Sequence, residues 1–188
     1  MSQPSGQIVR KPLRVREQSS RTLGERLSLR FPCLVHASAR LIGRLPPSSR
    51  VRQAVISRSA RQRMEAFNSS DIDAALIGSA PDFEYRPARE FVEMGFMEPC
   101  YCGPAGFRQY MSAWSEVWGA GLRTEPVEMI DLGDRIVLLA DLPTTGTASG
   151  VPVTGKIATV STVEHGRVIG VDMYMDHAEA LEAVGLRE

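Results

Sequence analysis

The stretch Arg-Met-Glu-Ala-Phe-Asn-Ser-Ser-Asp-Ile-Asp-Ala-Ala-Leu, residues 63–76, decides the fold together with Ala-Pro-Asp-Phe-Glu-Tyr-Arg-Pro, residues 80–87. The first stretch predicts a helix that ends at residues 68–70. Asparagine and serine side chains compete there with the helix for backbone hydrogen bonds. Either Ser70 or Asp71 is then expected to cap a second, short helix.

The second stretch predicts a strand at residues 83–86. Pro81 stops the short helix because it lacks a backbone N–H, and aromatic residues favour an extended chain. Upstream, apolar residues recur at three- and four-residue spacings, which predicts a long helix that starts near Arg50. Helix, polar turn, short helix and strand therefore follow one another.

The remainder of the chain predicts a loop, one more helix and a series of strands. The loop spans residues 87–104 and the helix residues 107–118. Gly166 supplies the positive φ of a tight turn between the last two strands, and Asp176 with Glu179 forms a capping box for a short final helix. Helices followed by an antiparallel meander indicate an α+β fold. The strands are expected at residues 123–130, 135–142, 151–163 and 167–175.

Composition excludes several classes of protein. The 188 residues are 43% hydrophobic, which suits one domain, and no apolar run approaches the ~18 residues that span a membrane. Three cysteines are too few for a disulfide scaffold, so we expect a reduced, cytoplasmic setting. The Cys100-Tyr101-Cys102 spacing does not match zinc sites, and no metal is expected.

Charge is distributed unevenly along the chain. Residues 1–63 carry thirteen arginines and one lysine against two glutamates, whereas residues 64–188 carry eight basic and twenty acidic residues. We therefore divide the chain into an Arg-rich extension, residues 1–48, and a domain, residues 49–188. The extension is expected to be disordered to about residue 20 and partly helical beyond it. The favoured interpretation is that it packs on acidic protein surface; contact with nucleic acid or an anionic membrane is the alternative.

The later sequence carries a resemblance to a known family. Ile-Asp-Leu-Gly-Asp-Arg-Ile-Val at residues 130–137, His-Gly-Arg-Val at residues 165–168 and the ending at residues 174–186 are similar to SnoaL-like proteins of the nuclear transport factor 2-like superfamily. The resemblance implies a cone-shaped barrel, in which a curved, mainly antiparallel sheet wraps around three N-terminal helices. It also implies one deep pocket, a homodimer, and chemistry that needs no cofactor.

The catalytic residues of the family's best-known enzymes are missing. By motif alignment, the three catalytic positions of the steroid isomerases fall on Arg86, Arg63 and Ala158, none of which retains the required group. The Asp-Arg-Asp set of limonene-epoxide hydrolases and the His-Asp pair of scytalone dehydratases are absent as well. An acid/base reaction of the polyketide-cyclase type remains open, because any pocket carboxylate could perform it.

Strand alternation and the family alignment together predict a site. Glu84 is the candidate general base and Arg86 the group that holds an anionic oxygen, or else the two form a structural ion pair at the rim. Asp172 is expected to face outward. The function is then either binding of a small apolar or polycyclic molecule with cyclase or isomerase chemistry, or a non-catalytic accessory role. The predicted pocket lining is Arg63, Phe67, Met111, Trp114, Ala158, Val160, Val171, Met173 and Met175.

Overall fold

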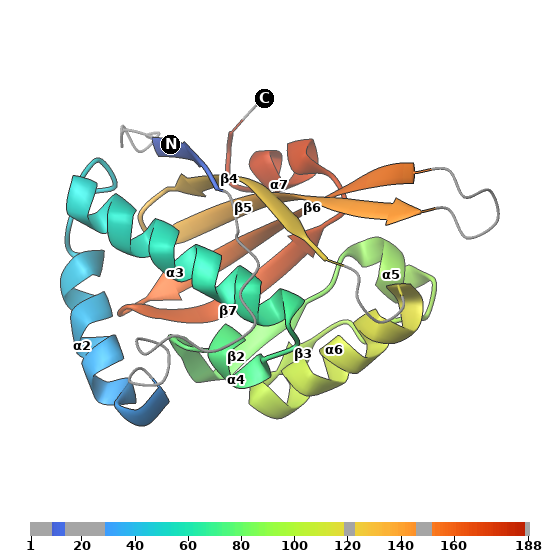
Figure 1. Cartoon of the computed structure of the whole chain (residues 1–188), viewed down its shortest axis with the longest axis horizontal. Helices are drawn as coiled ribbons and strands as arrows, with labels where there is room; N and C mark the ends of the chain where they lie inside the picture. Colours follow the sequence, from blue (N-terminus) through green and yellow to red (C-terminus); the bar gives the residue numbers. More distant parts are fainter. Residues whose placement is uncertain (1–8, 14–28, 119–122, 146–151, 187–188) are drawn as a thin grey trace.

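A computed structural model describes residues 9–13, 29–118, 123–145 and 152–186. One curved sheet forms the body of the molecule, and α3 runs along one of its faces (Figure 1). The helices are α2 (Pro32–Gly43), α3 (Arg50–Asn68), α4 (Ile72–Ala75), α5 (Arg89–Glu93), α6 (Gly103–Trp118) and α7 (His177–Ala183). The strands are β1 (Val9–Pro12), β2 (Ser79–Arg86), β3 (Tyr101–Cys102), β4 (Glu125–Asp131), β5 (Arg135–Thr145), β6 (Pro152–Glu164) and β7 (Arg167–Tyr174).

The sheet has seven strands in the order β1-β4-β5-β6-β7-β2-β3. All neighbours pair antiparallel except β2 and β7, which run parallel. The expected α+β cone is thereby confirmed: a mainly antiparallel sheet curves around helices, and a short helix ends the chain. None of the described helices is long and apolar enough to cross a membrane.

Local sequence explains where the helices begin. Ser49 caps α3, and the Asp71 carboxylate accepts a hydrogen bond from the Ala74 N–H at the start of α4. The Asp176 carboxylate accepts bonds from two backbone N–H groups at the start of α7. Residues 87–104 were expected to form a loop without regular structure, and this was wrong, because α5 and β3 lie within them.

The Arg-rich extension contributes to the sheet. Val9–Pro12 pair with β4, from Val9 opposite Asp131 to Pro12 opposite Glu128. Disorder was expected to about residue 20, so this part of the prediction was wrong; residues 1–8 and 14–28 lie outside the described part of the chain. The edge of β4 carries backbone N–H and C=O groups with which an extended segment can form hydrogen bonds. The composition of residues 1–20 does not reveal this pairing.

Two apolar clusters lie on opposite faces of the sheet. The larger lies between the helices and the concave face and contains an aromatic group in which Tyr85 and Tyr110 have ring centroids 4.2 Å apart. Phe107 and Trp114 extend this group along α6. The smaller cluster packs Ala180 and Leu181 of α7 against the other face. The clusters show which strand positions face which way.

A buried ion pair joins α3 to the end of β4. The Arg52 guanidinium donates from Nε and Nη2 to the two Asp131 carboxylate oxygens at 2.7 and 2.8 Å. Both side chains are almost completely buried, at 3% and 1% exposed. Arg52 also donates to the carbonyls of Gly43, Leu45 and Gly133, so one side chain ties the end of α2 and the β4–β5 turn to α3.

Candidate functional site

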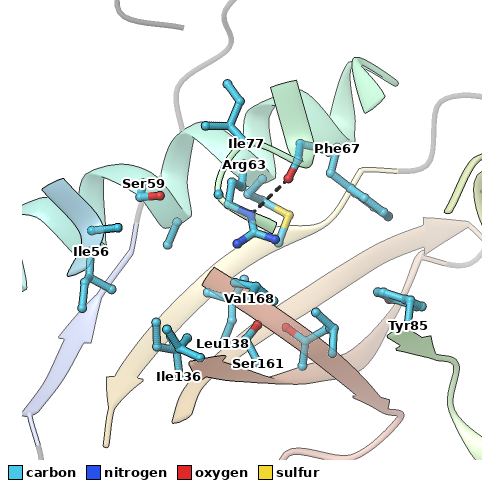
Figure 2. A pocket seen from close by; sticks show the side chains of 18 of the residues that line it. Ile56, Ser59, Arg63, Phe67, Ile77, Tyr85, Ile136, Leu138, Ser161 and Val168 are labelled. Carbon is cyan, nitrogen blue, oxygen red and sulfur yellow. Dashed lines mark hydrogen bonds between the residues drawn. The ribbon is translucent and has the colours of Figure 1, made fainter. Parts of the chain in front are cut away.

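A cavity of about 280 Å³ lies between the helices and the concave face of the sheet. Figure 2 shows α3 along one side of it and the strands on the other, with Arg63 pointing between them. The α3 residues that line it recur every three to four positions and so form one face of the helix; they are Arg52, Val55, Ile56, Ser59, Ala60, Arg63, Met64 and Phe67. Most lining side chains are apolar.

Strand register explains the opposite wall. Ser161 of β6 pairs with Ile136 of β5 and Val171 of β7, and Val171 in turn pairs with Tyr85 of β2. Residues directly opposite one another in a sheet share a face, so all four side chains line the cavity. The neighbouring row, in which Thr159 pairs with Leu138 and Met173, does the same.

The nine residues predicted to line the pocket fall into three groups. Those that line the cavity are Arg63, Phe67, Trp114, Val171 and Met173. Met111 is part of the apolar core and Met175 packs against it, but neither lines the cavity. Ala158 and Val160 lie on the opposite face of the sheet, against α7. Their placement in the pocket was wrong, because Thr159 and Ser161 take the inward positions of β6.

Glu84 and Arg86 lie outside the cavity. Phe83 and Tyr85 take the buried positions of β2, so the intervening Glu84 and the following Arg86 face outward, each with a side chain 45% exposed. Arg86 pairs there with Glu84 and, at 3.0 Å, with Asp172. The prediction that Glu84 and Arg86 point into the pocket was wrong, because the inward-facing set of β2 is the alternate one that contains Phe83 and Tyr85. Asp172 faces outward as expected.

Arg52 and Arg63 are the two charged side chains among the described residues that line the cavity. Arg52 is paired with Asp131, so the charge that faces the cavity without a carboxylate partner in the described residues is that of Arg63. Its Nε donates to the Ala75 carbonyl at 3.1 Å and its Nη2 to the Ser79 hydroxyl at 3.3 Å (Figure 2 shows the first). Both acceptors are neutral. Burial lowers the pKa of Arg63 to about 10, so the guanidinium stays charged at neutral pH in an unfavourable environment.

Two buried tyrosines add hydroxyl groups to the lining. The hydroxyls of Tyr85 and Tyr110 are 3.0 Å apart, and the Tyr110 hydroxyl lies 3.7 Å from the Met173 sulfur. Burial raises the pKa of both phenols, so each is a neutral hydrogen-bond donor at pH 7. Tyrosine was missed in the sequence-based site. The signal available was the alternation along β2, once Phe83 and Tyr85 are recognised as its inward set.

The structure also brings together three possible metal ligands. One ligand atom each of Glu84, Cys100 and Cys102 lies within 4.8 Å of the others. Arg86 is bound to the same Glu84 carboxylate, and burial raises the pKa of the Cys100 thiol, which disfavours the thiolate that metals require. Competition from Arg86 makes this a poor cation site.

Helix α2 closes one end of the cavity. Val35, Ala39 and Ile42 line it, and the α2 backbone lies close against the β6–β7 turn at Gly166. Arg167 Nη2 donates to His36 Nδ1 at 3.1 Å, which requires a neutral imidazole. The extension therefore supplies part of the site.

The contact between His36 and Arg167 predicts a pH dependence. Burial and the nearby Arg167 charge lower the pKa of His36 below 6.5. The unfolded chain therefore binds more protons just below pH 6.5, and α2 docking is fully stable above that pH and weakens as pH falls. The midpoint temperature of thermal unfolding should be lower at pH 5.5 than at pH 7.5. His36→Asn should reduce this difference, because asparagine keeps a hydrogen-bond acceptor but does not titrate.

The matched control for this prediction is His165→Asn. His165 sits in the adjacent turn at φ 50°, a conformation that asparagine tolerates. The other charged or titratable groups around the α2 contact are Cys33, Arg40 and Glu164. An equal reduction of the pH effect by both variants would contradict a specific role for His36.

A family model described as a SnoaL-like domain matches residues 60–171, more than half of the chain. A comparison with curated proteins finds no match. Among solved structures, TerC co-crystallised with polyporic acid is 24% identical over 66% of this chain and 94% of that one, with a TM-score of 0.55. An NTF2-like protein of unknown function from Burkholderia pseudomallei is 25% identical over 68% and 95%, with a TM-score of 0.54. A SnoaL-like protein of unknown function from Burkholderia thailandensis is 18% identical over 66% and 97%, with a TM-score of 0.51.

Proposed function

The chain belongs to the SnoaL-like domain family, and on that premise we propose that it binds a small, ring-bearing apolar molecule in the cavity beneath α3. The observation that carries this proposal is the cavity itself: about 280 Å³, walled mainly by apolar side chains from both the helices and the sheet. Small-molecule sites are apolar hollows of this kind with a few polar groups that orient the ligand. Arg63, Ser161 and the Tyr85–Tyr110 pair are such groups here.

A cavity-filling variant tests this function. Ser161→Trp places an indole in the hollow and is expected to abolish the saturable fluorescence enhancement of N-phenyl-1-naphthylamine, a neutral bicyclic probe. Ser112→Trp, on the exposed face of α6, adds the same indole outside the cavity and should leave binding within about twofold of wild type. Circular dichroism verifies that both variants fold. Binding of N-phenyl-1-naphthylamine by Ser161→Trp as tight as by wild type would contradict the proposal.

A second candidate is cofactor-independent cyclase or isomerase chemistry. Tyr85 donates its one hydroxyl proton to Tyr110. The donors left for an enolate oxygen are therefore the Tyr110 hydroxyl, now directed at the Met173 sulfur, and Arg63. No Asp or Glu is among the cavity-lining residues in the described ranges, so an enzyme would need its base elsewhere. Deuterium exchange at the α-carbon of 2-tetralone, followed by NMR in D₂O, separates this candidate from a non-catalytic binding module. Acceleration that Tyr110→Phe removes would support the enzyme.

The chain is further proposed to be a cytoplasmic homodimer. The resemblance implies dimerisation through the outer face of the sheet, on which α7 covers one part and the Glu84–Arg86–Asp172 group occupies another. The three cysteines are free, as a reducing compartment favours. Light scattering of the purified chain would give the oligomeric state directly.

A further inference from the structure

We propose that Arg63 is an anion anchor and that the ligand of the cavity is a carboxylate-bearing ring compound, with its acidic group against the guanidinium. This inference rests on the proposed binding function and adds the chemical class of the ligand. It is carried by the contrast between two arginines of one helix: among the described residues, one has a carboxylate partner and the other has none.

Arg52 and Arg63 both lie on α3 and line the cavity; Arg52 is buried and Arg63 is partly buried. A buried charge normally has a partner of opposite sign, because desolvation of an isolated ion is costly. Arg52 has one in Asp131, with both nitrogen–oxygen distances below 3 Å. Within the described part of the chain, Arg63 forms no ion pair and bonds only to the Ala75 carbonyl and the Ser79 hydroxyl.

The orientation of the guanidinium leaves donors for a ligand. Arginine has five N–H donors, and the bonds to Ala75 and Ser79 engage two of them. In Figure 2 the guanidinium lies between α3 and the strands, on the cavity side of the helix, with Ser161 on the wall beyond it. A planar fork of this kind matches the two oxygens of a carboxylate.

The surroundings of Arg63 favour an incoming anion. Burial lowers the pKa of Arg63, and no carboxylate of the described residues counters the effect. A carboxylate placed in the cavity would supply the missing charge in a medium of low dielectric, where such an interaction is stronger than in water. Apolar walls formed by Phe67, Trp114 and Val168 would bury the rest of the ligand. A cavity of about 280 Å³ is on the scale of a two-ring acid.

Binding of 2-naphthoate and 2-naphthamide to the full chain, measured by titration calorimetry at pH 7.5, tests the inference. The two probes share one skeleton and differ in charge. For the wild type, naphthoate is expected to bind about tenfold or more tightly than naphthamide, as charge-assisted hydrogen bonds are stronger than neutral ones. Arg63→Met should remove this preference while naphthamide binding is kept.

The control is Arg61→Met, an exposed arginine of the same helix, which should leave the preference unchanged. The wild-type comparison needs no variant, so the test survives if Arg63→Met fails to fold; Arg63→Lys, which keeps a charge but not the planar fork, should retain part of the preference. Equal binding of the two probes by wild type, or an unchanged preference in Arg63→Met, would overturn the anion anchor and leave the apolar site standing. Binding of neither naphthoate, naphthamide nor N-phenyl-1-naphthylamine would overturn both proposals.

Discussion

Asp131→Asn is expected to lower the free energy of unfolding by about 3–5 kcal/mol, because it leaves the buried Arg52 guanidinium without a counter-charge. Asp131 is 1% exposed and Arg52 3% exposed, so water cannot solvate the orphaned charge without opening the structure. Asp131 also accepts the Gly133 N–H at 3.0 Å, which orders the β4–β5 turn. A loss of this size is a large part of the total stability of a typical domain.

Urea denaturation of wild type, Asp131→Asn, Arg52→Met and the double variant measures this effect. The double variant should lose less free energy of unfolding than the two single variants together, since each single change leaves the other member of the pair buried without its counter-charge. Arg86→Gln is the matched control: it breaks an ion pair whose side chains are 45% exposed, so it should cost no more than about 1 kcal/mol. Equal losses of unfolding free energy in Asp131→Asn and Arg86→Gln would contradict the special cost of breaking a buried pair.

The sequence could not predict this pair, although it predicted most of the fold. Arg52 and Asp131 are 79 residues apart, and neither belongs to a local motif that requires the other. Caps and turns, in contrast, are local. Asp71, Asp176 and Gly166 each act within a few residues of themselves, so the ends of α4 and α7 and the β6–β7 turn could be predicted.

Strand parity explains why the site was predicted only in part. Val171 and Met173 were placed inward on β7, where they line the cavity, but β2 and β6 were each assigned the opposite face. A shift of one residue moves every side chain of a strand to the other side. The parallel pairing of Tyr85 with Val171 and the pairing of Ser161 with Val171 fix the correct face, and such register is a tertiary property.

Function was harder to predict than fold for the same reason. The one charged side chain of the predicted site that lines the cavity, Arg63, comes from a helix whose face could be deduced from its spacing. Helix α2, which closes one end, comes from the extension that the sequence separated from the domain at residue 48. Composition distinguishes the two segments, but packing joins them.

Gly166→Ala is expected to destabilise the chain and weaken ligand binding together. Gly166 has φ +78°, where a non-glycine residue costs about 1–2 kcal/mol. An added Cβ would lie 2.6 Å from the Arg40 backbone N and 2.7 Å from the Ala39 carbonyl carbon, distances that real Cβ atoms essentially never show. The obstacle is the backbone of α2, so the helix must move away from the turn.

Displacement of α2 would open the cavity, because Val35, Ala39 and Ile42 form one of its ends. We therefore expect Gly166→Ala to lose about 3 kcal/mol or more of unfolding free energy and about tenfold in affinity for N-phenyl-1-naphthylamine. Urea denaturation and fluorescence titration measure the two effects.

Gly185→Ala separates the close approach of α2 from backbone strain. Gly185 has the same φ of +78°, but no atom of the described residues lies within 4 Å of an added Cβ, so this variant carries the strain without the collision. It should cost only about 1–2 kcal/mol and leave probe binding unchanged. If Gly166→Ala behaved like Gly185→Ala in both measurements, α2 would not rest on the β6–β7 turn as described. If Gly166→Ala alone lost the probe, the Arg-rich extension would be an integral wall of the binding site rather than an appendage to it.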